Sequence, residues 1–235
     1  TERMAITLWG REYTRRELLA HVGDLGQVAG AERFTYTDGT ADGVRAVRVR
    51  TGGGLDFTVL LSRGMDIGAA SFRGVPIAWQ SATGAVHPHA LDQGQPDGRG
   101  WLRSFHGGLL TGCGLSNAGA ANTDSGESLG IHGFLSHLPA GETFAGIEWS
   151  GDEMAVVVRG TMREARVFGE NLRLDRTIVA PVGDSYLTVT DTVTNDGFTD
   201  VPLMLLYHLN FGFPLLSEAT ELVSNATHPP EPRDA

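Results

Sequence analysis

The sequence predicts an all-β protein with at most one short helix, and two observations carry this prediction. From residue 34 onward, short runs of alternating or continuous apolar residues are separated by turn-forming residues, as in β-strands. Glycine contributes 32 of 235 residues, about twice its usual share, and glycine-rich turns between short strands are typical of sandwiches and barrels. This length suits one large β-domain, so we expect a single domain over residues 1–235.

Net charge, apolar runs and cysteine content indicate which kinds of partner and location to expect. The formal net charge of −10 argues against a nucleic-acid partner. No apolar run is long enough to span a bilayer, and the N-terminus has no secretory pattern, so we expect no membrane association. The single cysteine, Cys113, excludes an intrachain disulfide and fits a cytoplasmic location. Its apolar neighbours predict a buried, inert thiol.

The first predicted element is a short helix near the N-terminus. Thr14 and Glu17 have the spacing of a capping box, and the apolar Leu18 and Val22 follow. Gly23 then breaks the pattern. We expect this helix to act as a lid or to cover a sheet edge.

Strands dominate the rest of the chain. Residues 44–50 alternate small or apolar residues with arginine, and residues 55–61 form the return strand of a hairpin. Farther on, regular turn spacing predicts a meander whose strands are 144–149, 155–161, 165–168, 172–179 and 186–193.

Residues 81–100 contain many Gly, Pro, Asp and His residues without periodicity, which predicts a long loop. His87 and His89 flank Pro88, but two histidines without a third ligand are weak evidence for a metal. We therefore predict a solvated loop, no metal and no cofactor.

The stretch Val201–Leu216 carries the first functional signal. Its apolar run from Pro202 to Tyr207 predicts a core strand. His208 and Asn210 are two residues apart, so a strand would present both on one face. Such a pair suits a small polar-ligand site, but this run alone favours a hydrogen-bonded core histidine.

Several blocks of the chain are similar to those of one known family. In order they are RGMDIG (63–68), a glycine-rich block with GGLL and CGL (101–119), GIHGF (130–134), FGENLRLDR (168–176), DTVTNDG (191–197) and LYHLNFGFPLL (206–216). This order resembles the aldose 1-epimerase (galactose mutarotase) superfamily, and most closely its branch called domain of unknown function 4432. The resemblance implies a galactose mutarotase-like β-supersandwich of large twisted antiparallel sheets.

The resemblance also implies an activity. Mutarotation interconverts the α and β anomers of an aldose through its open chain, which needs an acid at the ring oxygen and a base at the anomeric hydroxyl. His208 corresponds to the catalytic acid, and His132 would line the sugar pocket beside it. An imidazole that titrates near neutral pH suits the acid.

The family's general-base glutamate lies in a later portion that has no counterpart here, so we expect the chain to lack the C-terminal part of the family pattern. Either Glu164 or Glu170 substitutes for that base, or the C-terminal part of the family pattern supplies it.

Further residues are candidates for substrate binding, but each also has a structural interpretation. Arg63 and Asp66 could bind sugar hydroxyls, although a salt bridge across their turn is favoured. Glu164 and Arg176 could contact hydroxyls or be exposed cross-strand partners, and the residues favour neither. The remaining candidates are Asn210, His106 and Asn117. Trp79, Trp101 and Phe211 could stack on a sugar ring, but most aromatic residues on strands belong to the core.

Three hypotheses for function remain open. The first is a metal-free sugar epimerase of the mutarotase type. The second is a carbohydrate-binding domain without turnover, because one fold supports both uses. The third is an isomerase or lyase acting on an acidic sugar. The expected partner is a small sugar, and a homodimer is possible.

Overall fold

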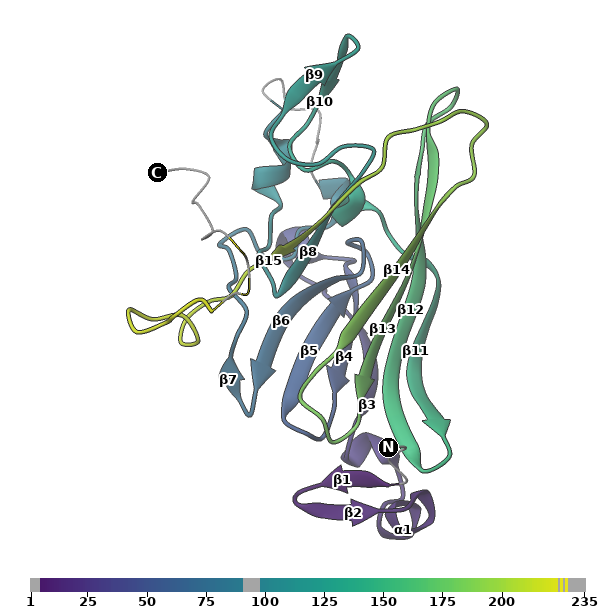
Figure 1. Ribbon diagram of the computed structural model, residues 1–235, viewed down its shortest axis with the longest axis vertical. Helices are drawn as coiled ribbons and strands as arrows, with labels where there is room; N and C mark the ends of the chain where they lie inside the picture. The colour runs from purple at the N-terminus through teal and green to yellow at the C-terminus, as the bar shows by residue number, and fades with distance from the viewer. Residues whose placement is uncertain (1–4, 91–97, 224, 226, 228–235) are drawn as a thin grey trace.

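The computed structural model describes residues 5–90, 98–223, 225 and 227. It consists of two main antiparallel sheets packed face to face, with two small hairpins outside them (Figure 1). The all-β prediction is therefore confirmed.

The larger sheet has seven strands. In spatial order they are β15 (Met204–Leu209), β8 (Leu110–Leu115), β6 (Asp66–Phe72), β5 (Leu55–Leu60), β4 (Arg45–Arg50) and β3 (Gly30–Thr35), and β7 (Val75–Pro76) pairs with β6. Strands β4 and β5 confirm the hairpin predicted over residues 44–61.

The smaller sheet is a four-stranded meander. Its strands are β11 (Gly141–Ser150), β12 (Glu153–Ala165), β13 (Asn171–Pro181) and β14 (Thr188–Asn195). Along β13 every second residue is buried, including Leu172, Leu174 and Ile178. These side chains share one core with Phe57 and Val59 of the larger sheet, as expected for two sheets packed by their apolar faces.

Polar contacts join the two sheets along both margins. On one side Arg33 of β3 donates to the hydroxyl and to the carbonyl of Thr143 on β11, each over 3.1 Å. On the other side the Tyr207 hydroxyl of β15 donates to the Asp191 carboxylate of β14 over 2.9 Å. The second margin includes the strand that carries His208.

The predicted N-terminal helix is confirmed. Helix α1 (Arg15–His21) is preceded by Thr14, whose side chain accepts from the Glu17 backbone while Glu17 caps Thr14 in return. Leu18 is buried beside the hairpin of β1 (Ile6–Leu8) and β2 (Arg11–Tyr13). No helix among the described residues combines the length and apolarity needed to cross a membrane.

Short elements complete the described chain. They are the hairpin strands β9 (Asn122–Asp124) and β10 (Glu127–Leu129), and the 3-10 turns η1 (Leu25–Gln27), η2 (Gly39–Ala41), η3 (Pro88–Ala90), η4 (Gly100–Arg103) and η5 (Leu135–His137). The predicted loop 81–100 thus includes η3 and the start of η4, and residues 91–97 lie outside the described residues.

The strand predicted at 165–168 is wrong. Strand β12 continues through Ala165, and the chain then reverses so that β13 can pair with it. Gly169 donates to the Arg166 carbonyl, and Phe168 has φ 63°, a left-handed conformation found in turns. The alternating pattern before this turn belongs to one long strand.

The core position predicted for residues 202–207 is also wrong. The strand β15 forms, but it lies at the edge of its sheet and pairs only with β8 within the described part of the chain. Most of its apolar side chains are consequently exposed, with Leu206 at 41% and Leu209 at 56%, whereas Leu205 is half-buried against the core.

Candidate functional site

The rings of His132 and His208 meet on one side of the larger sheet. His208 projects from β15 and is half-buried, whereas His132 lies in the turn before η5 and is buried. Their ring centroids are 5.6 Å apart with an interplanar angle of 85°, an edge-to-face contact. Two imidazoles from distant parts of the sequence therefore share one small volume.

Two aromatic side chains form a wall against this pair. Trp101 of η4 stacks on Phe105 at 4.4 Å and meets His132 at 4.6 Å, and Phe105 meets His208 at 5.3 Å. Trp101 is fixed by donation from its indole nitrogen to the Ser136 hydroxyl over 3.1 Å. Sequence reasoning did not single out Phe105 as a site residue, and its only signal is its position within the glycine-rich block 101–119.

The backbone at His132 explains its fixed orientation. His132 has φ 61°, which is uncommon for a residue with a side chain, and Nδ1 accepts from the Gly119 backbone N–H over 3.3 Å. In a neutral imidazole this contact leaves the proton on Nε2. Gly133 must be glycine, because a Cβ there would lie 2.3 Å from the Asn117 carbonyl oxygen.

His208 and Asn210 have different surroundings. His208 pairs in register with Thr111, and its buried Nδ1 has no hydrogen-bond partner among the described residues. Asn210 lies just beyond β15, and its amide nitrogen contacts the carbonyls of Gly107 at 3.3 Å and His208 at 3.1 Å. In this arrangement the Asn210 amide fastens the loop before β8 to the end of β15.

Behind the histidine pair lies a layer of buried polar groups. Arg63, Asp66 and His106 are all buried, and most of their polar atoms have no hydrogen-bond partner among the described residues. Burial lowers the pKa of His106 to about 3, helped by the charge of Arg63, and so keeps the ring neutral. Burial likewise raises the pKa of Asp66 to about 7 and lowers that of Arg63 to about 10.

The favoured salt bridge between Arg63 and Asp66 is not a hydrogen-bonded pair. Arg63 Nη1 donates to the Val86 carbonyl over 2.5 Å, and Asp66 Oδ1 accepts from the Gly112 N–H over 2.8 Å. The two charges still interact, because each opposes the effect of burial on the other's pKa. The turn between β5 and β6 directs the two side chains to different backbone partners.

Three other candidates for substrate binding are engaged with the protein itself. Glu164 accepts from the Leu115 backbone N–H over 2.7 Å and from the Ser116 hydroxyl. Arg176 forms a two-point ion pair with Asp191. Asn117 donates to the Gly130 carbonyl over 2.8 Å. The alternative of exposed cross-strand partners is wrong in its exposure, because Glu164 and Arg176 are both buried. Arg176 does contact a neighbouring strand through Asp191, whereas Glu164 bonds to the end of β8 in the larger sheet.

Metal ligation finds no support in the described part of the chain, where no three His, Cys, Asp or Glu side chains gather in a metal-binding arrangement. His87 and His89 lie together, with centroids 4.9 Å apart, but without a third ligand of this kind. Cys113 is buried, and burial raises the pKa of its thiol to about 12, consistent with an inert residue.

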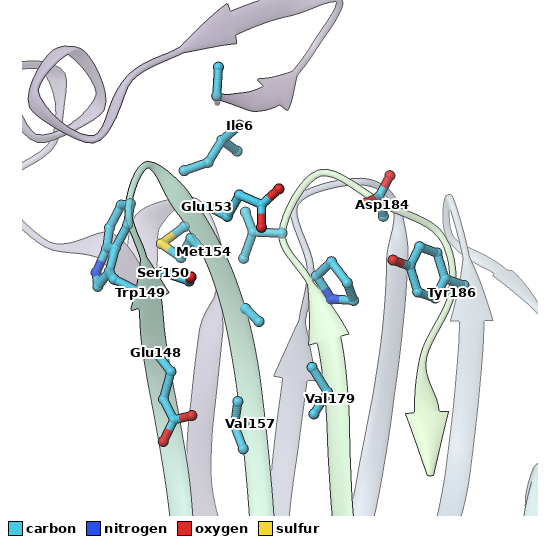
Figure 2. A pocket seen from close by; sticks show the side chains of 14 residues that line it. Ile6, Glu148, Trp149, Ser150, Glu153, Met154, Val157, Val179, Asp184 and Tyr186 are labelled. Atoms are coloured by element: carbon cyan, nitrogen blue, oxygen red, sulfur yellow. The ribbon is translucent and has the colours of Figure 1, made fainter. Parts of the chain in front are cut away.

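A hollow of about 720 Å³ lies near the hairpin β1–β2, lined by the ends of β11, β12 and β13 (Figure 2). Trp149, Met154 and Tyr186 contribute much of its wall. It includes neither histidine of the pair, so we do not assign the sugar site to it.

Comparison with solved structures identifies the fold. The fold matches a candidate aldose 1-epimerase from Klebsiella pneumoniae subsp. pneumoniae MGH 78578 with a TM-score of 0.74 and 24% identity, over 79% of this chain and 48% of that one. The galactose 1-epimerase from Lactobacillus acidophilus NCFM matches with a TM-score of 0.44 and 14% identity, over 72% of this chain and 49% of that one. The first of these two matches shows that the fold is aldose 1-epimerase-like, which confirms the predicted galactose mutarotase-like β-supersandwich.

The chain belongs to the domain of unknown function (DUF4432) family, whose model matches residues 41–235. No curated protein matches it. The matched region spans about half the length of each of the two solved structures.

Proposed function

We propose that this protein acts on a small sugar as an aldose 1-epimerase-like isomerase. The observation that carries the proposal is the contact between His132 and His208, whose rings lie 5.6 Å apart against Trp101 and Phe105. A polar pair beside an aromatic wall suits a sugar, which has hydroxyls at its edge and an apolar ring face. The epimerase-like fold supports this choice of substrate class.

In the proposed reaction His208 is the acid. Its imidazolium gives a proton to the ring oxygen while the bond from that oxygen to the anomeric carbon breaks. A base takes the proton of the anomeric hydroxyl, and a carbonyl forms at that carbon. Rotation about the adjacent carbon–carbon bond and reversal of these steps give the other anomer. His132 orients the sugar and stabilises charge near the ring.

The base is not assigned. Glu164 is bonded to Leu115 and Ser116, and Glu170 forms an ion pair with Arg166 at 3.0 Å. Both carboxylates considered for the role thus already have protein partners. This observation favours the second candidate function, a carbohydrate-binding domain that does not turn the sugar over.

Anomeric exchange measured by NMR separates the two functions. A panel of aldoses is mixed with the wild type, with His208→Ala and with the control His89→Ala, which changes an exposed histidine outside the site. The proposal expects exchange faster than in buffer for the wild type and the control, with a loss of about a hundredfold or more in His208→Ala. Binding without exchange in the wild type would establish the binding domain instead.

Location and assembly are further parts of the proposal. The single cysteine supports a reducing compartment, and we propose the cytoplasm. Among the described strands β15 has a neighbour on one side only, and this supports pairing of two copies, because an exposed strand edge offers unpaired backbone groups.

A further inference from the structure

Strand β15 carries His208 and is joined to the smaller sheet by a hydrogen bond from Tyr207 to a buried acceptor. The Tyr207 hydroxyl donates to Asp191 Oδ2 over 2.9 Å. Asp191 in turn accepts from Arg176 at both oxygens, over 2.8 and 2.7 Å. The side chains of Arg176 and Asp191 are 0% and 2% exposed, so the tyrosine contacts a buried ion pair.

Arg176 also bonds to the larger sheet. Its Nη1 donates to the carbonyl of Gly64 at 3.1 Å, with that of Met65 at 3.5 Å. The same turn leads into Asp66, whose carboxylate accepts from the Gly112 N–H of β8. Arg176 therefore connects β13 of the smaller sheet to the turn between β5 and β6 of the larger sheet.

The contacts of Asp66 and of Tyr207 meet at the pairing of β8 with β15. Gly112, bonded to Asp66, is the register partner of Tyr207 in the pairing of β8 with β15. A Cβ at Gly112 would lie 2.9 Å from Leu135 and 3.5 Å from the Arg176 guanidinium, so a glycine leaves the room that this group occupies. Strand β15 thus bonds to the buried ion pair directly, whereas β8 is linked to it through Asp66 and the turn that Arg176 bonds.

We infer that Arg176 and Asp191 act through Tyr207 as positioning residues that fix the His208 ring against His132. Tyr207 and His208 are adjacent on a strand, so their side chains point to opposite faces. The ion pair therefore contacts no substrate and sets only where β15 lies. This inference rests on the proposed function for its catalytic meaning, and its structural part stands independently.

Strand β15 needs this additional contact because it lies at the edge of its sheet. Among the described strands β15 pairs only with β8, and most of its apolar side chains are exposed. Such an edge strand is expected to open more readily than a central strand. A hydrogen bond to a charged, buried acceptor is among the stronger polar contacts in proteins. Because general acid catalysis depends on placement within a fraction of an ångström, loss of this contact affects catalysis more than binding.

The test compares Tyr207→Phe, which removes one hydroxyl, with the control Tyr186→Phe, which removes one from a tyrosine outside the site. Asp191→Asn keeps the shape of the carboxylate but removes its charge. For Tyr207→Phe we expect backbone amides of β15 to exchange with solvent about tenfold to a hundredfold faster. The 15N signals of the His208 ring should shift or broaden, while those of buried His106 stay in place.

Activity supplies the second readout. If the wild type catalyses anomeric exchange, Tyr207→Phe and Asp191→Asn should lower kcat about tenfold or more with little change in KM. Tyr186→Phe should leave all of these quantities unchanged.

Unchanged His208 ring signals and unchanged β15 amide exchange in Tyr207→Phe would overturn the inference, whatever the activity. A wild type without catalysis would remove the proposed function alone, because the ring signals and the amide exchange still decide whether the ion pair holds the strand.

Discussion

His132 donates its backbone N–H to the Gly119 carbonyl while the Gly119 N–H donates to the His132 ring, over 2.9 and 3.3 Å. Two contacts between the same residues fix both the turn and the imidazole. The ring of His132 therefore approaches His208 in one orientation, which a sugar-contacting group requires.

This relationship predicts a graded result at the two histidines. His132→Gln should lower kcat about tenfold and raise KM, because it removes an orienting group but leaves the proposed acid. His208→Ala should lower kcat by about a hundredfold or more. Steady-state anomeric exchange on one aldose measures both. Equal losses would assign His132 a direct part in proton transfer, and no loss in either variant would exclude this pair from catalysis.

Gly133→Ala tests the tight turn that presents His132. A Cβ at residue 133 would lie 2.3 Å from the Asn117 carbonyl and 2.5 Å from that of Gly114, and φ is 69°. We expect a loss of about 2–4 kcal/mol in the free energy of unfolding, from overpacking and backbone strain together. The control Gly126→Ala has φ 86° but nothing within 4 Å of its Cβ, so it reports strain alone. If urea unfolding shows that Gly133→Ala and Gly126→Ala lose the same free energy of unfolding, overpacking at residue 133 is contradicted.

The buried polar layer predicts a dependence of stability on pH. Folding lowers the pKa of His106, and of the buried His137 in η5, from 6.5 to about 3, chiefly through burial. As the pH falls below 6.5, only the unfolded chain therefore takes up a proton at each of these two histidines. Folding raises the pKa of Asp66 from 3.8 to about 7, which changes stability in the opposite direction. The stabilisation from the protonated Asp66 carboxyl is present at low pH and is lost as pH rises through 7. Between about pH 4 and 6.5 the unfolded chain therefore binds about one extra proton, and stability falls by about 1.4 kcal/mol per pH unit on acidification.

Asp66→Asn removes the carboxyl whose proton uptake on folding opposes the effect of the two histidines on stability. The amide oxygen can still accept from the Gly112 N–H, but the carboxyl proton no longer offsets the histidines. The slope should then approach about 2.7 kcal/mol per pH unit over the same range. Urea unfolding at several pH values between 4 and 6.5 measures both slopes, and identical slopes would refute the raised pKa of Asp66.

The open edge of β15 predicts self-association. The segment from Val201 to Leu216 carries no acidic or basic side chain other than His208, and its strand exposes apolar residues. Leu206→Lys places a charge on this strand and should shift the protein toward the monomer in size-exclusion chromatography with light scattering. The control Phe198→Lys changes an equally apolar, fully exposed residue in the loop before β15. A wild type that is monomeric at all concentrations would contradict the proposed pairing.

Local pattern alone determined much of this protein. Alternation of apolar residues gave the β4–β5 hairpin and most of the meander, and the Thr14–Glu17 spacing gave α1, because these features depend on neighbours within a few residues. Motif order in the chain also indicated the family and pointed to His132 and His208.

Tertiary structure decided what each side chain contacts. The apolar run at 202–207 resembles a core strand in sequence, yet its burial depends on which strands flank it, and β15 has only β8 among the described strands. Neither the contact of Phe105 with His208 nor that of Asp191 with Tyr207 had a sequence signal, because both arise where segments distant in the chain meet. Likewise Arg176 could equally have bound a sugar, and only the folded sheet shows its guanidinium held by Asp191. Sequence periodicity reports the local backbone, whereas pairing between sheets depends on the packing of the whole chain.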